Sequence, residues 1–281
     1  MFERITYIAE VFFLNPGLFF KKIIGKMLIK FAPAPEGERP VKISAHTIIV
    51  WPARNIWWKS MYLGCCDVEI EQNLKRYLPE SGVFIDVGAG VGYFSALASK
   101  IIGSAGRVYC FEPHPSTARA IRKMIDSNPN SNIVLNDCAL GADDSTHNYY
   151  IQRFNGHTEV SMVANLLGKA EEVIKVRTRR LDDYLKENRI DEVSLIKIDV
   201  EGFEYFVLKG LEGYFKKSKH RSPIICEISP SACARLGYTL KELCGFMADY
   251  GYQAYNIFNS NRKENIELAQ EEKDVVFRAK E

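Results

Sequence analysis

The order of apolar and polar positions divides the chain near residue 83. Beyond that point, short apolar runs are separated by stretches in which apolar residues recur at helical spacing. The runs cover residues 83–87, 107–111, 132–139, 193–199 and 223–228. Because a strand that is covered on both faces has a continuous apolar run, this rhythm predicts a parallel sheet with crossover helices and an α/β fold.

Further elements are expected on either side of this series. Residues 239–250 have the spacing of an amphipathic helix, and residues 252–258 and 274–279 are typical of late strands that close one edge of the sheet. Residues 41–50 alternate between apolar and polar positions, which predicts short strands or a hairpin, and residues 68–77 predict a helix. We expect this earlier segment, which includes the three tryptophans, to cover the main body of the protein and not to react.

The first 31 residues are apolar and aromatic, but Pro16, Gly17 and four lysines interrupt them. The longest uncharged stretch, residues 11–20, is far shorter than the roughly 20 residues of a spanning helix, and a small-residue signal cleavage site is missing. Past Gly17, six apolar residues recur at helical spacing and the lysines take the other side, which predicts an amphipathic helix. The apolar positions are Phe20, Ile23, Ile24, Met27, Leu28 and Phe31, and the lysines are Lys21, Lys22, Lys26 and Lys30.

Two interpretations of this helix stay open. It packs on the domain behind it, which we slightly favour, or residues 1–31, with a local net charge of +3, lie on an anionic membrane surface. A proline-rich, charged link follows at residues 33–40. We therefore divide the chain into an N-terminal helical segment with its linker (1–40), cap strands and a helix (41–82) and the main domain (83–281). We expect a cytoplasmic protein, either free or peripheral on the inner face of the membrane.

Composition and charge exclude several classes of protein. The chain has 37 Lys and Arg against 35 Asp and Glu, a formal charge of +2, so it lacks the basic excess of a nucleic-acid-binding protein and we expect no nucleic-acid partner. Its 47% apolar and 26% charged residues are typical of a globular protein. The seven cysteines form no C-x-x-C pair, so they indicate neither a disulfide framework nor a zinc site and fit a reducing cytoplasm.

The most informative segment joins a buried strand to a helix through Gly88, Gly90 and Gly92. Glycine permits positive φ and close approach of a ligand, and the start of a helix presents free amides. A dinucleotide-binding turn, G-x-G-x-x-G, requires glycine at position 93, where this chain has Tyr93. Asp86, just before the turn, would repel a phosphate but favour a sulfonium or an ammonium, and S-adenosylmethionine carries both.

Two more acidic residues follow the next predicted strands. Glu112, in Phe111-Glu112-Pro113, comes 24 residues after Gly88. This is the spacing expected for a carboxylate that accepts hydrogen bonds from both ribose hydroxyls. Asp137 ends the third strand and is placed to accept from the exocyclic amine of adenine. Each acid alone is as readily a helix cap or a solvated strand end. Together with the glycine turn, acids at the ends of successive strands indicate a nucleotide-type crevice.

The end of the fourth predicted strand carries the candidates for chemistry. Lys197, Asp199 and Glu201 alternate, so they share one face of an extended strand. Charges at the end of a buried run are costly unless they are paired or functional, and a purely structural Lys197–Asp199 pair is the alternative. Asp199 or Glu201 is placed to take the proton that an alcohol loses when it is methylated, or to orient its hydroxyl.

Other candidates carry less weight. Asp199 and Glu201 would begin an oxygen-ligand site for a divalent cation, but the sequence shows no complete ligand set, so a metal is not favoured and no ligand is assigned. His114 is near the expected adenosine site but is typical of an exposed loop histidine. Glu227 ends another strand and either holds substrate or is a surface carboxylate. Residues 143–180 are typical of an inserted hairpin and loop, where substrate selection is expected.

Several motifs together resemble those of the FkbM family of S-adenosylmethionine-dependent methyltransferases. They are residues 84–95 around the glycine turn, Phe111-Glu112-Pro113, Ala139-Leu140-Gly141, residues 176–183 and residues 196–202. The resemblance covers roughly residues 60–280. Cys65-Cys66-Asp67 and the basic first 35 residues depart from the family pattern.

The resemblance implies a Rossmann-like class I methyltransferase, with a seven-stranded, mostly parallel sheet whose last strand is antiparallel. It also implies O-methylation of a hydroxyl on a sugar, a glycolipid or another small metabolite, with S-adenosylmethionine as the cofactor. We assign cofactor binding to Asp86, Gly88, Ala89, Gly90, Tyr93, Glu112, Pro113, Asp137, Cys138 and Asp199, and catalysis to Asp199, Glu201 and Lys197. Two other classes stay open, a non-catalytic cofactor-binding or scaffold protein of the same fold and, less favoured, a nicotinamide-dependent oxidoreductase.

Overall fold

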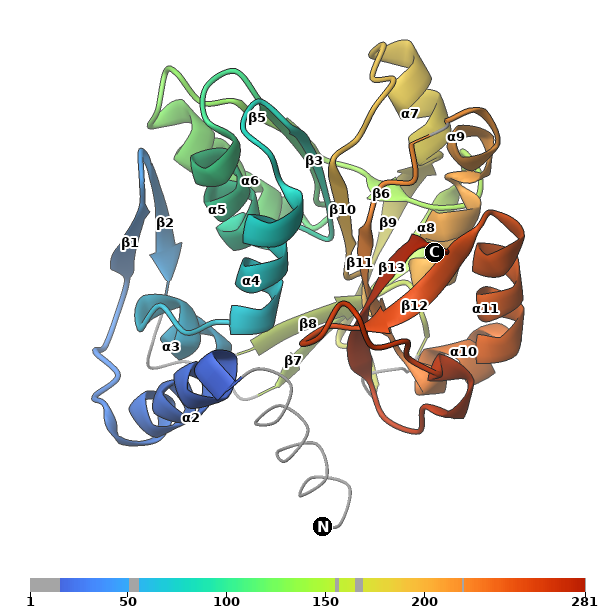
Figure 1. The fold of residues 1–281 in the computed structure, drawn as a ribbon. Coiled ribbons are helices and arrows are strands. Elements are labelled where there is room, and N and C mark those ends of the chain that lie inside the picture. The colour runs from blue at the N-terminus through green and yellow to red at the C-terminus, as the bar shows by residue number, and fades with distance from the viewer. Residues whose placement is uncertain (1–15, 51–55, 155–156, 165–168, 219, 281) are drawn as a thin grey trace.

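The computed structural model describes residues 16–50, 56–154, 157–164, 169–218 and 220–280. Residues 1–15 of the N-terminal apolar segment and Trp51 of the cap segment lie outside these ranges. The described chain forms an α/β fold in which helices cover both faces of a central sheet (Figure 1). The α/β prediction is therefore confirmed.

The central sheet has seven strands. Their spatial order is β12 (Tyr252–Asn256), β13 (Lys273–Ala279), β11 (Ile224–Ile228), β10 (Leu195–Ile198), β3 (Val83–Val87), β4 (Arg107–Phe111) and β5 (Ile133–Asn136). Every neighbouring pair is parallel except the two that contain β13, which is antiparallel to β11 and to β12. This arrangement confirms the expected mostly parallel sheet with an antiparallel last strand.

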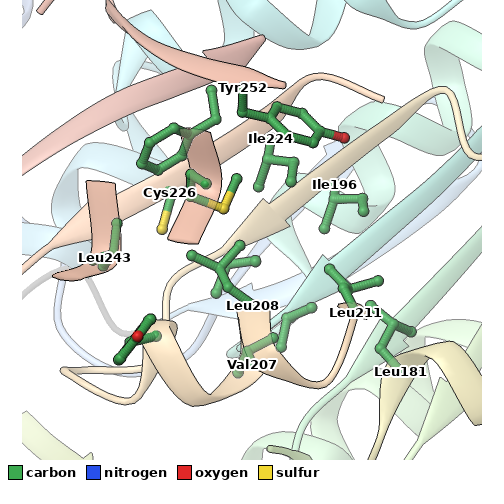
Figure 2. Packing of buried hydrophobic residues seen from close by; sticks show 14 of the residues in the cluster. Leu181, Ile196, Val207, Leu208, Leu211, Ile224, Cys226, Leu243 and Tyr252 are labelled. Atoms are coloured by element: carbon green, nitrogen blue, oxygen red, sulfur yellow. The ribbon is translucent and has the colours of Figure 1, made fainter. Parts of the chain in front are cut away.

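Side chains of alternate residues on the central strands pack into two separate hydrophobic cores, one on each face of the sheet. On β3, Ile85 packs into the core of one face and Phe84 into the core of the other, as the two-residue period of a strand requires. Figure 2 shows the first of these cores, in which side chains of β10 and β11 meet helical side chains. The residues labelled there are Leu181, Ile196, Val207, Leu208, Leu211, Ile224, Cys226, Leu243 and Tyr252. Burial on both faces explains the continuous apolar runs of the sequence.

The helices divide between the two cores. The first core is covered by α7 (Leu181–Glu187), α8 (Glu204–Lys209), α9 (Glu212–Lys217), α10 (Pro230–Leu236), α11 (Leu240–Asp249) and the short η1 (Ile266–Leu268). The second is covered by α2 (Pro16–Phe31), α3 (Ile56–Tyr62), α4 (Val68–Tyr77), α5 (Tyr93–Ile102), α6 (Pro115–Asp126) and the hairpin of β1 (Arg39–Ile43) and β2 (His46–Val50). The predicted helices at 68–77 and 239–250 are confirmed, and a capping box between Thr239 and Glu242 begins the second of them.

The third predicted strand is shorter than its apolar run. Residues 132–139 were expected to form one strand, but β5 ends at Asn136 and the chain turns at Asp137 and Cys138. Beyond the turn, β6 (Ala139–Leu140) joins a separate four-stranded sheet with β9 (Glu172–Arg179), β7 (Thr146–Phe154) and β8 (His157–Ser161), in the order β6-β9-β7-β8. The expected inserted hairpin is the antiparallel pair β7–β8. An apolar run shows burial but not the point at which a chain changes its pairing partner.

The N-terminal helix α2 packs on the second core with its apolar stripe facing outward. Leu18 and Gly25 are buried against the domain, whereas Ile24, Met27 and Phe31 are more than half exposed. The packing expected for this helix is present, but through a face other than the apolar one. Within the described ranges, no helix combines the length and apolar character needed to cross a membrane.

Candidate functional site

The glycine turn lies at the carboxyl end of β3, between β4 and β10. Gly88, Gly90 and Gly92 all have positive φ, at 78°, 57° and 83°, as their alternate spacing predicts. The amides of Gly88 and Ala89 donate to the carbonyl of Phe111 at 3.0 and 3.2 Å, which ties the turn to the end of β4. A Cβ atom on Gly88 would meet the carbonyl of Asp199, so the turn also touches the end of β10. The three strand ends therefore meet around one turn.

Glu112 stands at the tip of β4 and is held rigidly. Its Oε2 accepts from the Gly90 amide at 2.8 Å, and its Oε1 accepts from the His114 amide at 2.9 Å and from the Thr117 hydroxyl at 2.8 Å. Burial raises the pKa of Glu112 to about 7, although these three donors act in the opposite direction. The carboxylate of Glu112, which we expected to bind the ribose, thus lies directly beside the glycine turn.

Asp86 and Lys197 are cross-strand neighbours beneath the turn. The two residues are paired in the register of β3 and β10, and their charged groups lie 4.0 Å apart. Asp86 is fully buried, and its Oδ2 accepts from the Ser95 hydroxyl at 2.6 Å. Burial raises the pKa of Asp86 despite the opposing effects of Lys197 and Ser95. Because its oxygens face Ser95 and Lys197, contact between Asp86 and a ligand stays a prediction.

Lys197 bridges two carboxylates. Its Nζ donates to Asp199 Oδ2 at 2.9 Å, and Asp199 retains a side chain that is 38% exposed at the end of β10. Burial acts to lower the pKa of Lys197, but Asp199 and Asp86 together raise it above its ordinary value. The lysine is therefore a buried, permanently charged group that fixes the position of Asp199.

Glu201 does not share the face of Lys197 and Asp199. The strand ends at Ile198, and Glu201 adopts a positive φ of 54°, so the two-residue alternation expected over 197–201 breaks before it. Glu204, which the sequence analysis missed, accepts from the amides of Val200 and Gly202 at 3.0 and 2.9 Å and so shapes this loop. The sequence signal that could have identified Glu204 is an acidic residue two positions after Gly202, in the first turn of α8.

The remaining predicted cofactor residues have different surroundings. Asp137 is 69% exposed and pairs with Arg122 at 3.1 Å, whereas Cys138 is partly buried beside the first core. Pro113 is partly buried between Glu112 and His114. The Tyr93 ring is buried and lines a cavity of about 480 Å³ between β1, the α3–α4 connection and α5. Its lining includes neither the turn glycines nor Glu112 and Asp199.

Two contacts bring further elements to the turn and to the loop after β10, and the sequence analysis missed both. A Cβ atom on Gly90 would lie 3.5 Å from the ring of Trp57, so α3 of the cap segment forms a wall beside the turn. Ser161, at the end of β8, donates to the carbonyl of Glu201 at 2.6 Å, which attaches the four-stranded sheet to the loop after β10. Neither contact has a local sequence signal, because each joins segments that are far apart in the chain.

A second group of acidic residues lies at the ends of β11 and β13. Glu227 and Asp274 face each other in the strand register. Burial, reinforced by Asp199, raises the pKa of Glu227 to about 12 and that of Asp274 to about 8. Burial therefore favours the protonated form of both carboxyl groups. Among the described residues, no cluster of three or more His, Cys, Asp or Glu side chains has the arrangement of a metal site.

The groups around the turn suit a nucleoside that carries positive charge. Asp86, Glu112 and Asp199 are acidic, and the Lys197 ammonium is already engaged by two of these three carboxylates. A diphosphate would meet the carboxyl groups of Glu112 and Asp199 unfavourably, because Lys197 is already paired with Asp86 and Asp199. The partly exposed glycine turn lets a ligand approach closely, and the Glu112 carboxylate is a hydroxyl acceptor beside it; both fit S-adenosylmethionine.

Comparison with known proteins agrees with this geometry. The family model described as Methyltransferase FkbM domain matches residues 86–254, more than half of the chain. Methyltransferase 1 of Beauveria bassiana is 28% identical over 151 residues, which are 48% of this chain and 60% of that protein. The hexuronic acid methyltransferase AglP of Haloferax volcanii is 27% identical over 153 residues, which are 52% of this chain and 58% of that protein. The matched region thus spans about three fifths of each curated relative.

Among solved structures, the chain is similar to that of M. jannaschii TYW2 in complex with AdoMet. The likeness covers 88% of this chain and 87% of that one, at a TM-score of 0.42 and 16% sequence identity.

Proposed function

Because the chain belongs to the family of FkbM-domain methyltransferases, we propose that it transfers the methyl group of S-adenosylmethionine to a hydroxyl of a sugar, a glycolipid or another small metabolite. The observation that carries the proposal is the convergence of Gly90, Glu112 and Asp199 at the carboxyl ends of three adjacent strands. In an open α/β sheet this edge is where ligands bind.

The cofactor would be held by the glycine turn and by Glu112. The carboxylate of Glu112 would accept from the ribose hydroxyls, and Asp137, at the tip of the third strand, would accept from the adenine amine. Trp57 would close the crevice on the side of Gly90. When bound, S-adenosylmethionine supplies a methyl group on a positively charged sulfur, which an oxygen nucleophile displaces in line.

Asp199 is the residue that would orient the acceptor hydroxyl. Lys197 holds its Oδ2, which leaves Oδ1 to accept the hydroxyl proton. In the transfer, a C–O bond to the methyl carbon forms as the S–C bond breaks, and the proton passes from the hydroxyl to Asp199. A carboxylate paired with a lysine is a weak base, so its main effect is to position the oxygen and to take the proton late.

A sugar acceptor is supported by one relative and by the surroundings of the crevice. AglP is named for the methylation of a hexuronic acid. In this chain, burial and the charge of Asp199 raise the pKa of Glu227 and of Asp274, which favours their neutral forms and suits neutral hydroxyls better than cations. The four-stranded sheet reaches the same loop through Ser161, so its hairpin would contribute to the choice of acceptor.

The proposal is tested by incubating the purified chain with S-adenosylmethionine labelled in its methyl group and with hexuronic-acid-containing oligosaccharides, neutral oligosaccharides and extracted glycolipids. We expect label in a product that survives mild alkali, since a methyl ether resists hydrolysis that releases a methyl ester. If alkali released the label, the methylated atom would be a carboxylate oxygen and not a hydroxyl oxygen. Tight cofactor binding without transfer to any fraction would instead favour a non-catalytic protein of this fold.

A further inference from the structure

The orientation of α2 is the opposite of what its amphipathic pattern suggests. A helix that packs on a domain normally buries its apolar stripe and exposes its lysines. Here Lys22 Nζ lies 2.7 Å from Glu69 Oε1 on α4, and Lys21 Nζ lies 3.3 Å from Glu71 Oε2. The apolar stripe is exposed on the other side. We call Ile23, Ile24, Met27, Leu28 and Phe31, which are between 38% and 71% exposed, the outer face of α2.

Three further contacts fix this orientation. Gly25 is buried against Cys65, and a Cβ atom on Gly25 would lie 3.0 Å from the Cβ of that residue, so only glycine lets the helix approach this closely. Leu18 is buried in the second core. The Lys22 ammonium also lies 4.5 Å from the centre of the Phe258 ring. The helix therefore cannot roll its apolar side inward without losing two ion pairs and the close approach of Gly25 to Cys65.

Most of the outer face points away from the packed face. At about 100° per residue, Leu18 and Gly25 are roughly 160–180° around the helix from Met27. Lys26 and Lys30 are both exposed and lie along one flank of the outer face. The adjacent helix α3 exposes two more large apolar side chains, Ile56 and Trp57. An apolar strip bordered by cations is the arrangement of a helix that lies in a membrane interface.

We propose that α2 docks the protein on an anionic lipid bilayer, with its outer face among the acyl chains and Lys26 and Lys30 at the headgroups. The packed face, held by Lys21 and Lys22, keeps the domain attached above the helix. Contact with lipid removes the five apolar side chains from water, and the two flanking lysines add attraction to anionic headgroups. The proposal concerns docking alone and does not depend on the acceptor of the methyl group.

A second copy of the chain is the competing occupant of this surface. An antiparallel two-fold pairing of outer faces would place Lys26 and Lys30 of both copies along the same edge of the interface. Like charges along its border would oppose that pairing, whereas they favour an anionic bilayer. Charge therefore selects the membrane over the dimer.

The test uses the full chain and vesicles of phosphatidylcholine, either alone or mixed with phosphatidylglycerol. Cosedimentation should show binding to the mixed vesicles that weakens as salt is raised. Ile24→Asp/Met27→Asp should abolish binding, and Lys26→Gln/Lys30→Gln should weaken it by about 30-fold, with loss of the preference for phosphatidylglycerol. The control is Leu268→Asp, which places one aspartate on an apolar side chain that is 76% exposed on η1, outside α2 and α3; its single-variant match is Ile24→Asp, which should already weaken binding.

The variants distinguish docking on lipid from loss of folding and from dimer formation. Ile24→Asp/Met27→Asp should bind S-adenosylmethionine as the unmodified chain does, which shows that the domain is folded. Unchanged vesicle binding in this variant, or equal loss in Leu268→Asp, would overturn the proposal. It would also be overturned if the unmodified chain ignored vesicles and formed a dimer in sedimentation equilibrium that the aspartates dissociate.

Discussion

A Cβ atom on Gly88 would lie 1.8 Å from the carbonyl oxygen of Asp199, so the turn that follows β3 and the end of β10 touch through their backbones. The contact leaves no room for a side chain. It also sets the distance between the turn that would bind the cofactor and the carboxylate that would orient the acceptor. Any substitution that separates the two segments is expected to affect both binding and transfer.

Alanine substitutions in the turn should therefore have unequal effects. Gly88→Ala combines a positive φ with a backbone collision and should destabilise the fold by roughly 2–5 kcal/mol. Gly90→Ala meets only the Trp57 ring at an ordinary contact distance, so backbone strain of about 1–2 kcal/mol is its main cost. Urea unfolding of the two variants measures the difference, and equal losses would contradict the contact with Asp199.

Removal of the Glu112 side chain should weaken cofactor binding. Glu112→Ala deletes the proposed acceptor of the ribose hydroxyls and frees the Gly90 amide, at a cost of about 2–3 kcal/mol, or roughly 30- to 150-fold in Kd. Isothermal titration with S-adenosylmethionine measures this loss. Glu187→Ala, which removes an exposed carboxylate paired with Arg179, serves as the control and should leave Kd unchanged. A Glu112→Ala titration that matches the unmodified chain would refute the role of Glu112.

The raised pKa of Glu112 predicts a pH dependence of cofactor affinity. Burial raises this pKa to about 7, so the free protein carries a mostly protonated Glu112 below that pH. An ionised carboxylate is the stronger acceptor for ribose hydroxyls, so affinity should rise by about tenfold from pH 6 to pH 8. The same shift makes folding stability fall as pH rises from about 4.5 to about 7, because the buried carboxyl must ionise.

The variant Glu112→Gln isolates this titration. It keeps a side chain of the same shape but has no proton to lose in this range, so its affinity profile should lack the step between pH 6 and pH 8. Glu204→Gln removes a different buried carboxyl, whose pKa burial also raises to about 7, and should retain the step. If the affinity step between pH 6 and pH 8 disappeared only with Glu204→Gln, its cause would be the ionisation of Glu204, which binds the loop after β10.

Asp199→Asn should separate binding from turnover. Asparagine has the same shape and still accepts from Lys197 through its amide oxygen, but it cannot take a proton from the acceptor. We expect kcat to fall by about 10²- to 10⁴-fold, with the Kd of S-adenosylmethionine within about twofold of the unmodified value. A single-turnover assay with the labelled donor gives the first quantity and calorimetry the second. Normal values of both would show that Asp199 does no chemistry.

The sequence predicted most of the central sheet, because its strands are buried on both faces and its turns carry glycine. Strands β3 and β4 have the predicted bounds, and the glycines of the turn have the positive φ expected of them. The sequence did not predict the end of β5 or the four-stranded sheet, since both depend on pairing between distant segments. Likewise, apolar spacing identified the amphipathic helix α2 but not which of its faces meets the domain.

The site shows the same division between local and distant information. The placement of Glu112 beside the turn follows from its strand end, a local property. The burial of Asp86 against Lys197 and the wall formed by Trp57 require the register of β3 with β10 and the packing of α3. No spacing rule within a single segment contains that information.

The buried Lys197 predicts a large and specific loss of stability. Lys197→Met removes the only cation placed beside Asp86 in the described chain and leaves a fully buried carboxylate uncompensated, which should cost about 3–5 kcal/mol at pH 7. The loss should shrink at pH 5, because a buried, unpaired carboxyl takes up a proton. Lys75→Met, which breaks an exposed ion pair with Glu71, is the control and should cost less than about 1 kcal/mol.

The double variant Lys197→Met/Asp86→Asn tests the cause of that loss. If the cost arises from the unpaired charge of Asp86, the uncharged asparagine should recover much of the stability in urea unfolding, and the remaining loss should no longer depend on pH between 5 and 7. If the double variant were as unstable as Lys197→Met alone, the cost would not come from the charge of Asp86, and the lysine would act through its other contacts, which include its ammonium 5.3 Å from the centre of the Phe94 ring.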